Sequence, residues 1–338
     1  MKQLIPGQLI GNYRLIRELG AGAVGAVYEV EHQNLKVHYA LKVFTFMGGS
    51  AELLRKRFEA EGRVLARLKH RNLARVIDLG FDDGLGVNYF VMDLVLSQSG
   101  EPKSLASIEP GSVDEDQIAI WFAELCEALT YIHSQGIIHR DVKLDNALIN
   151  AEGHIILSDF GISRFVDPDL KKVVNVTATM VLPAGKIVMG TPAYMAPELL
   201  RGEDASAASD VYALGVLIFR LLTSVWYDPT LAPRECAEPK TAIDSIRLLK
   251  MFDLPWINVL PKMLDDDPTK RPMNLHELPG KLHGHIIPQW WKRVALILGV
   301  MMLIAGTLLC WDEFIYRGKE DVFIECFGVD GVFDGGEE

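Results

Sequence analysis

Residues 139–146 read HRDVKLDN, and residues 159–161 read DFG. Two short apolar runs with a polar turn between them occupy most of the thirteen positions from Asn146 to Asp159. Apolar runs on either side of a turn predict a β-hairpin. We expect this hairpin to bring Asn146 and Asp159 to the same end of its two strands.

The polar residues of these stretches are groups that phosphoryl transfer requires. An aspartate such as Asp141 must orient the attacking hydroxyl and accept its proton, and a lysine such as Lys143 must balance charge on the moving phosphoryl group. Asn146 and Asp159 offer hard oxygen ligands of the kind that Mg²⁺ prefers. The sequence therefore predicts a phosphoryl-transfer site at this end of the hairpin.

A glycine-rich stretch precedes these motifs. Residues 20–27 read GAGAVGAV, which fits the pattern G-x-G-x-x-G-x-V. Glycines let backbone N–H groups approach phosphates where a Cβ would clash. The β-like runs on both sides argue against a dinucleotide-binding turn, which opens into a helix. Taken alone, the motif fits an ordinary glycine-rich hairpin equally well.

Lys42 lies in an apolar run that predicts a strand. A half-buried lysine requires an anion. The candidate anions are a phosphate of ATP and a carboxylate from the following helical segment, where Glu61 stands 19 residues further on. Taken alone, Lys42 fits an ordinary lysine of an edge strand better.

Hydrophobic periodicity predicts a strand-rich first part and a helical second part. We expect strands at 12–19, 26–32, 39–46, 74–79, 89–94, 147–149 and 155–157. We expect helices at 51–68, 116–135, 208–222 and 243–251. Residues 97–111 predict a polar loop or insertion, and 167–190 show no clear period and predict an irregular loop.

With these motifs, residues 11–285 resemble the eukaryotic-like (Hanks-type) Ser/Thr protein kinases of bacteria. The resemblance implies an α+β, bilobal protein-kinase fold. The small, strand-rich N-lobe would span about 11–92, and the larger helical C-lobe about 97–285.

The resemblance also implies roles for individual residues. Asp141 would be the catalytic base, Lys143 would lie near the γ-phosphate, and Lys42 would bind the α/β-phosphates with Glu61 as its ion-pair partner. ATP and its metal ion, Mg²⁺ or Mn²⁺, would contact Leu19, Gly20, Gly22, Gly25, Val27, Ala40, Lys42, Met92, Asp93, Val95, Asn146 and Asp159, of which Asn146 and Asp159 are the metal ligands. Structural and regulatory roles would fall to Arg140, Phe160, Gly161, Thr177, Thr179, Thr191, Glu198, Asp210 and Arg271.

The substrate class follows from two details of the resemblance. Lys143 and the stretch 190–194, which reads GTPAY, are typical of serine/threonine kinases rather than tyrosine kinases. Arg140 precedes the base, and in the family this arginine often pairs with a phosphate on the activation loop. Thr177 and Thr179 are the natural acceptors, the alternative being that both are plain loop threonines.

Composition excludes other functions. The formal net charge of −11 argues against a nucleic-acid binder, which would show a basic patch. The four cysteines are far apart, so a metal site or a disulfide framework is not expected.

Residues 294–311 form an 18-residue run without a charged side chain. This length is close to what a helix needs to cross a bilayer. Lys292 and Arg293 precede the run and acidic residues follow it, so the positive-inside rule places the kinase-like part in the cytoplasm. We expect a single-pass protein of the cell (inner) membrane, with a juxtamembrane linker at 286–293 and a short acidic tail at 312–338 outside. The alternative is a buried C-terminal helix.

The run contains the spacing Ala295-x-x-x-Gly299, which lets two helices approach closely and suggests a homodimer. Three functional hypotheses stay open: an active kinase acting on protein substrates, a nucleotide-binding pseudokinase scaffold, and a receptor whose outer tail is the sensor.

Overall fold

The computed structural model describes residues 4–22, 25–44, 51–109, 111–159, 179–181, 187–189, 192–223 and 255–282. The chain divides into two units, Met1–Gly284 and His285–Glu338. The predicted linker, membrane span and acidic tail all lie in the second unit, outside the described residues. Within the described ranges, no helix is long and apolar enough to cross a membrane.

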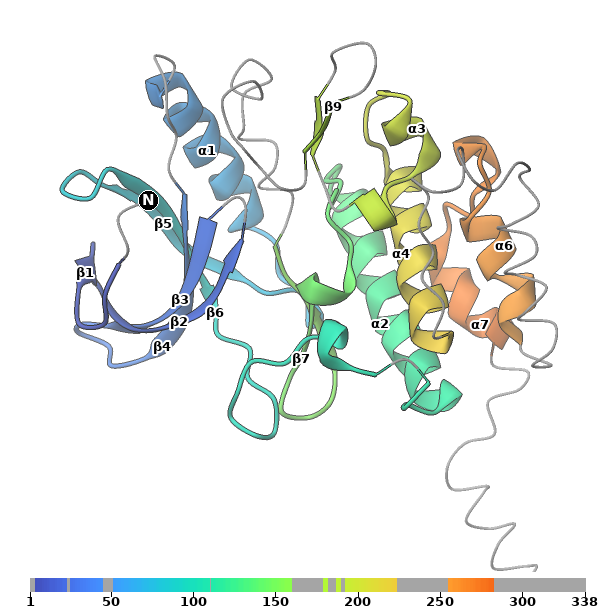
Figure 1. Ribbon diagram of the computed structural model, residues 1–338, viewed down its shortest axis with the longest axis horizontal. Helices are drawn as coiled ribbons and strands as arrows, with labels where there is room; N and C mark the ends of the chain where they lie inside the picture. The colour runs from blue at the N-terminus through green and yellow to red at the C-terminus, as the bar shows by residue number, and fades with distance from the viewer. Residues whose placement is uncertain are drawn as a thin grey trace, which may run out of the picture. The chain divides into compact units, whose positions relative to one another are not determined.

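The N-terminal part of the first unit is a six-stranded antiparallel sheet in the order β1-β2-β3-β4-β6-β5 (Figure 1). Its strands are β1 (Leu9–Ile10), β2 (Tyr13–Gly22), β3 (Gly25–His32), β4 (His38–Phe44), β5 (Val76–Asp82) and β6 (Val87–Asp93). The apolar side chains of β2, β3 and β4 are divided between the two faces of the sheet, because successive residues of a strand face opposite sides. The sheet therefore has an apolar cluster on each face.

Helix α1 (Ala51–Leu65) covers one of these faces. Phe58 of α1 stacks on Phe90 of β6 with a centroid separation of 4.2 Å, and Phe44 of β4 packs edge-on against both rings. A Cβ on Gly62 would lie 2.7 Å from the ring of Phe90, so this glycine lets the helix approach the sheet closely.

The second part of the first unit is mostly helical. Its helices are α2 (Glu115–Ser134), α3 (Pro197–Leu200), α4 (Ala207–Leu222), α6 (Leu260–Met263) and α7 (Leu278–Leu282). Short 3₁₀ turns lie at Leu105–Ser107, Leu144–Asn146, Pro192–Tyr194, Pro255–Asn258, Pro268–Lys270 and Leu275–Glu277.

Both long helices begin at a capping residue. Asp114 accepts a hydrogen bond from the backbone N–H of Gln117 at the start of α2, and Ser206 and Ser209 form a capping box at the start of α4. Nearly every side chain of α4 is buried, so α4 is the central helix of this part.

The hairpin of β7 (Ala147–Ile149) and β8 (Ile155–Leu157) has the boundaries predicted from the sequence. Backbone hydrogen bonds join Leu157 of β8 to Asn72 and Ala74, which lie between α1 and β5. The hairpin is thereby tied to the segment that connects α1 to the sheet.

Where residues are described, the predicted strands and helices agree with the structure to within a few residues at each end, with two differences. Strand β1 was not expected, and it begins before residue 11, where we placed the start of the domain. The expectation of an irregular loop over 167–190 is wrong in part, because β9 (Thr179–Val181) pairs with β10 (Ile187–Met189). The expected helix at 243–251 lies outside the described residues.

Candidate active site

Residues 139–146, the predicted catalytic loop, are held at their start by Asp210, a residue of α4 whose side chain is almost fully buried. Oδ2 of Asp210 accepts a hydrogen bond from the backbone N–H of His139, and Oδ1 accepts one from that of Arg140, both at 2.8 Å. His133 of α2 contacts Oδ2 of the same carboxylate at 2.8 Å. A buried helix therefore fixes the backbone immediately before Asp141.

His139 is fully buried, and its contacts define its protonation. Its Nε2 lies 3.0 Å from the carbonyl oxygen of Ser158, which can only accept, so Nε2 carries a proton. Its Nδ1 accepts from the backbone N–H of Asp141 at 3.3 Å. Burial lowers the pKa of His139. The imidazole is thus neutral and positions the loop, while the carboxylate of Asp141 is the available base.

Asp141 is bound by the two residues that the sequence groups with it. Nζ of Lys143 lies 2.9 Å from Oδ2 of Asp141, and Nδ2 of Asn146 donates to the same oxygen at 2.8 Å. Nδ2 of Asn146 also donates to the backbone carbonyl of Asp141 at 2.7 Å. Among the described residues, these contacts leave Oδ1 of Asp141 for an incoming hydroxyl.

The hairpin places Asn146 beside the residue that precedes Asp159. The backbone N–H of Ser158 donates to the carbonyl oxygen of Asn146 at 2.8 Å, and the Ser158 hydroxyl donates to it at 3.1 Å. Asn146 and Asp159 therefore lie at one end of β7 and β8, as the apolar pattern predicts.

Lys42 of β4 forms an ion pair with Asp159, with 2.7 Å between Nζ and Oδ1. The lysine side chain is 13% exposed and the aspartate side chain 24%, so the pair is largely buried but can still be reached by a ligand. Of the two anions expected for Lys42, a carboxylate is therefore present, and the one that the structure describes is that of Asp159. The side chain of the expected partner, Glu61 in α1, lies outside the described part of the chain.

Two site residues have unusual backbone conformations. The φ angles of Arg140 and Asp159 are 69° and 61°, in the left-handed region that non-glycine residues rarely adopt. Such conformations persist where the surrounding structure over-determines them, and they cluster at functional sites. At Arg140, Asp210 supplies this restraint.

The glycine-rich stretch forms the ends of β2 and β3. A Cβ on Gly25 would lie 2.0 Å from the backbone oxygen of Val43, so this position requires glycine for the pairing of β3 with β4. A Cβ on Gly20 would meet nothing within 4 Å, and Gly20 therefore borders open space. Gly22 is the last residue of β2.

The residues expected to hold adenine come from adjacent strands. Ala40 of β4 pairs with Met92 of β6, both buried, and Asp93 ends β6. Val95 follows in the connection to the helical part and is also buried. Leu19 and Val27 pack against the apolar cluster that contains Ala40 and Met92.

Glu198 and Arg271, which the resemblance expects to pair, form a buried bidentate ion pair. Nη1 and Nη2 of Arg271 lie 2.7 Å and 2.8 Å from the two carboxylate oxygens of Glu198. Burial on its own would raise the pKa of Glu198, but hydrogen bonds from Arg271 and Ser209 outweigh it and hold the pKa below its usual value. The pair fixes α3 against the start of α4, because Arg271 also donates to the carbonyl oxygen of Ala208.

Several expected site residues cannot be placed. Phe160, Gly161, Thr177 and Thr191 lie outside the described residues, and of Thr179 only the backbone, in β9, is described.

The residues present fit ATP with a divalent cation. Nδ2 of Asn146 donates to Asp141, which leaves its Oδ1 available to a metal ion, and Asp159, which follows Ser158 at the same end of the hairpin, supplies carboxylate oxygens. Among the described residues, no cluster of three or more His, Cys, Asp or Glu side chains could hold a metal on its own. Mg²⁺ is commonly bound by one or two protein oxygen ligands, with phosphate oxygens and water in its other coordination positions. Asn146 and Asp159 could supply such a pair of ligands.

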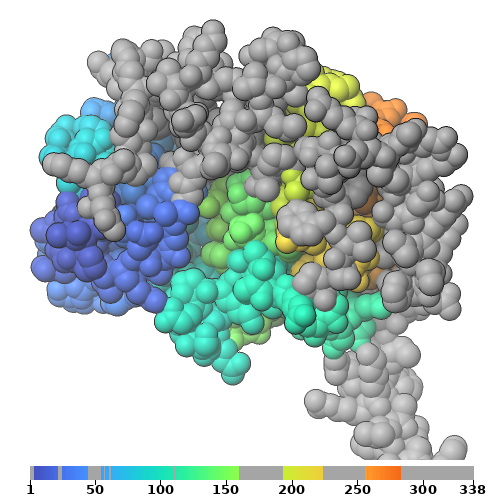
Figure 2. All heavy atoms as spheres, viewed as in Figure 1, coloured from blue at the N-terminus to red at the C-terminus, as the bar shows by residue number. Residues whose placement is uncertain are grey.

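Besides the ion pair of Lys42 with Asp159, two contacts in this region were not predicted. His133 contacts Asp210, and no spacing in the sequence indicates it. Arg17 of β2 binds Glu101, in the segment after β6, with 2.6 Å between Nη1 and Oε2. Figure 2 shows this segment, drawn in cyan-green, next to the blue atoms of the first strands.

Comparisons with known proteins identify the family. A family model described as a protein kinase domain matches residues 13–278, and the chain belongs to this family. The serine/threonine-protein kinase pkn2 of Myxococcus xanthus is 31% identical over 290 residues, which cover 82% of this chain and 33% of that protein. PknA of Mycobacterium tuberculosis is 37% identical over 212 residues, which cover 62% of this chain and 46% of that protein.

The crystal structure of the Mycobacterium tuberculosis PknI kinase domain is 26% identical, with a TM-score of 0.59, and the match covers 83% of this chain and 99% of that one. The predicted bilobal kinase fold and the resemblance to bacterial Hanks-type kinases are thus confirmed. The matches span between about a third and a half of the length of the curated relatives.

Proposed function

We propose that this chain transfers the γ-phosphoryl group of ATP to serine and threonine hydroxyls of protein substrates. The observation that carries the proposal is the contact set around Asp141, whose Oδ2 is bound by Lys143 at 2.9 Å and by Asn146 at 2.8 Å. Relatives named serine/threonine-protein kinases support the substrate class.

In this proposal each described residue has a distinct task. Asp141 orients the substrate hydroxyl and takes its proton on the oxygen that Lys143 and Asn146 leave open. Lys143, beside Asp141, balances charge on the phosphoryl group. Lys42 and Asp159 bring a cation and an anion from the two lobes together at the place expected for the phosphates. Bound Mg²⁺ would neutralise developing charge on the phosphate oxygens.

A labelling experiment tests the proposal. The full chain, in mild detergent, is incubated with [γ-³²P]ATP and Mg²⁺ or Mn²⁺, beside Asp141→Asn and the matched control Asp204→Asn, an exposed aspartate outside the site. We expect label in the wild type and in the control, and none in Asp141→Asn. ATP binding without label in any of the three proteins would favour the pseudokinase scaffold.

Autophosphorylation of the activation loop is part of the proposal. Arg140 follows a histidine fixed by Asp210 and has the left-handed backbone described above, which restricts where its side chain can reach. Mass spectrometry of the labelled wild type should find phosphate on Thr177 or Thr179. Label confined to other segments would remove this role.

Membrane anchoring by residues 294–311 is also part of the proposal. It rests on 18 residues without charge, preceded by Lys292 and Arg293. The full chain should resist alkaline extraction from inner membranes, and the acidic tail should be cleaved by protease from the outside only. Release of the intact chain by alkaline carbonate would contradict the anchor, and a monomeric crosslinking pattern in membranes would contradict the homodimer.

A further inference from the structure

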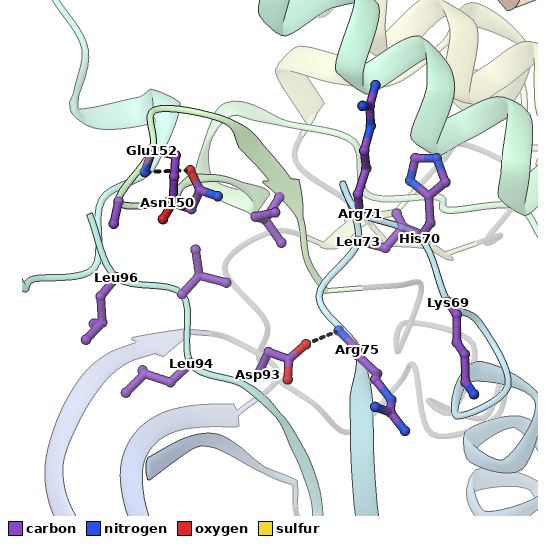
Figure 3. A pocket seen from close by; sticks show the side chains of 13 residues that line it. Lys69, His70, Arg71, Leu73, Arg75, Asp93, Leu94, Leu96, Asn150 and Glu152 are labelled. Carbon is purple, nitrogen blue, oxygen red and sulfur yellow. Dashed lines mark hydrogen bonds between the residues drawn. The ribbon is translucent and has the colours of Figure 1, made fainter. Parts of the chain in front are cut away.

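A pocket of about 570 Å³ lies beside the connection between the two lobes (Figure 3). It includes neither Lys42, Asp141, Lys143, Asn146 nor Asp159, but Asp93 and Val95, which are expected to contact adenine, also line it. Its walls come from three places: the stretch between α1 and β5, the connection after β6, and the turn between β7 and β8. The apolar part is formed mainly by Leu73, Leu94, Leu96 and Ile156. Of these, only Leu73 is buried, so the other three present apolar surface to the pocket.

One side of the pocket carries two available cations, Lys69 and Arg75. Both side chains are exposed, and neither has a carboxylate partner within 4.0 Å among the described residues. Figure 3 shows both side chains extending from the same side of the pocket. A third cation, Arg71, is already bound to Glu127 at 2.6 Å. Burial lowers the pKa of the neighbouring His70, which therefore adds no charge at neutral pH.

The remaining polar side chains, Asp93, Asn150 and Glu152, suit an extended chain better than a small anion, because two of the three are acidic. Asp93 has one carboxylate oxygen bound to the backbone N–H of Arg75 at 3.1 Å, and its other oxygen can accept a hydrogen bond from a ligand N–H. Asn150, at the opposite side of the pocket, uses its Oδ1 to accept from the turn, which leaves its amide N–H groups as donors. Hydrogen-bond donors, an acceptor, apolar surface and cations thus lie at different places along the pocket. A bound peptide could meet them with its backbone N–H and C=O groups and its side chains in turn.

We propose that this pocket binds a peptide segment of a protein partner that carries acidic side chains next to an apolar one. The carboxylates would pair with Lys69 and Arg75, and the apolar side chain would lie on Leu94, Leu96 and Ile156. Charge complementarity favours this occupant, because the exposed side chains of Lys69 and Arg75 have no carboxylate partner among the described residues. That the partner is a substrate, held here while another segment enters the active site, rests on the proposed kinase function.

The test begins with selection of peptides. The full chain as Asp141→Asn, without ATP, is applied to an immobilised library of random 12-residue peptides, so that turnover plays no part. We expect the retained peptides to be enriched in Asp or Glu beside Leu, Ile, Val or Phe. Retention of no peptides, or of peptides without acidic residues, would overturn the proposal.

Charge reversal then locates the binding site. The best retained peptide, labelled with fluorescein, is titrated by anisotropy against Lys69→Glu/Arg75→Glu and against the matched control Arg63→Glu/Arg67→Glu, which makes the same charge change on exposed residues outside the pocket. Attraction becomes repulsion only in the first variant, so we expect its Kd to rise about tenfold or more and that of the control to change by less than about twofold. Equal weakening in both variants would show non-specific attraction and reject the pocket.

The outcome is independent of catalysis. A chain that binds the peptide but incorporates no phosphate would retain the docking pocket and lose the proposed kinase function. A chain that phosphorylates substrates but fails the peptide selection would keep the proposed kinase function and lose the docking pocket.

Discussion

At the scale of single residues, the site depends on buried charges that are completely paired. Arg271 and Glu198 are 0% and 2% exposed in their side chains, so neither can be stabilised by water if its partner is removed. We expect Arg271→Met to lower the free energy of unfolding by about 3–5 kcal/mol at pH 7, because Glu198 would be left as an uncompensated buried charge. Chemical denaturation measures this loss. Lys270→Met, which removes an exposed cation one position away, should change stability by less than about 0.5 kcal/mol.

The same pair predicts a pH dependence with a defined sign. The pKa of Glu198 is lowered in the folded state, so its contribution to stability is present above the unfolded pKa of 4.5 and is lost as the pH falls through the folded value. In Arg271→Met, burial would instead raise the pKa of Glu198. Protonation of Glu198 would then remove the uncompensated buried charge and make the variant less unstable. The stability difference between wild type and variant should therefore narrow as the pH falls from 7 toward 4.5. A difference that is constant over this range would show that the loss comes from packing.

Asp210 acts on catalysis through the backbone that it holds. Asp210→Asn keeps one acceptor oxygen and replaces the other with an NH₂ group, which only donates. The variant side chain therefore cannot accept from the N–H of His139 and from that of Arg140 with separate oxygens. We expect kcat to fall on the order of 100-fold, since a displacement of about 1 Å at the base is enough for such a loss. The KM for ATP should change little, because Lys42 and the segment after β6 do not contact Asp210. A rise in KM with an unchanged kcat would place Asp210 in nucleotide binding instead.

At the scale of elements, Gly20 and Gly25 of the glycine-rich stretch serve different purposes. Gly25→Ala would place a Cβ 2.0 Å from the backbone oxygen of Val43, and backbone cannot yield as a side chain does. We expect this change to destabilise the N-lobe by about 1–3 kcal/mol, as overpacking does. Gly20→Ala meets nothing within 4 Å and should leave stability nearly unchanged while weakening ATP binding. Thermal unfolding and ATP titration of the two variants compare these effects directly.

The elements also show what the sequence alone can predict. The hairpin of β7 and β8 was predicted to the residue, because two three-residue apolar runs flank a turn. Strand β1 was missed, since two residues show no period, and it is defined by its antiparallel pairing with β2. Strands β9 and β10 were missed because each has only three residues and shows no clear period, and they are defined by their pairing with each other.

In the candidate active site, too, the sequence predicts the local groupings and not the contacts between distant residues. Asp141, Asn146 and Asp159 could be grouped from spacing, because a hairpin brings its ends together. The contact of Lys42 with Asp159 joins residues 117 positions apart, and that of His133 with Asp210 joins residues 77 apart. No local pattern encodes such distances, so the roles of Asp210 and Arg271 came from the family resemblance and their geometry from the fold.

At the scale of the first unit, the strand-rich and helical parts contact each other at the catalytic site. Lys42 and Asp159 come from different parts, and nucleotide with Mg²⁺ would bind both. A ligand that binds only the folded state stabilises it, by about 2.7 kcal/mol at a concentration 100 times its Kd. We therefore expect saturating ADP with Mg²⁺ to raise the unfolding temperature of both parts together, as one transition in calorimetry.

Asp159→Asn separates the contributions to this linkage. The variant keeps a side chain of the same size but loses the carboxylate that pairs with Lys42 and that would bind the metal. ADP alone should still stabilise the variant through the residues after β6, whereas the additional shift on adding Mg²⁺ should be lost. An unchanged Mg²⁺ shift in Asp159→Asn would move the metal site to other residues. Two separate transitions in the wild type, of which only the first responds to nucleotide, would show instead that the two parts do not share the ligand.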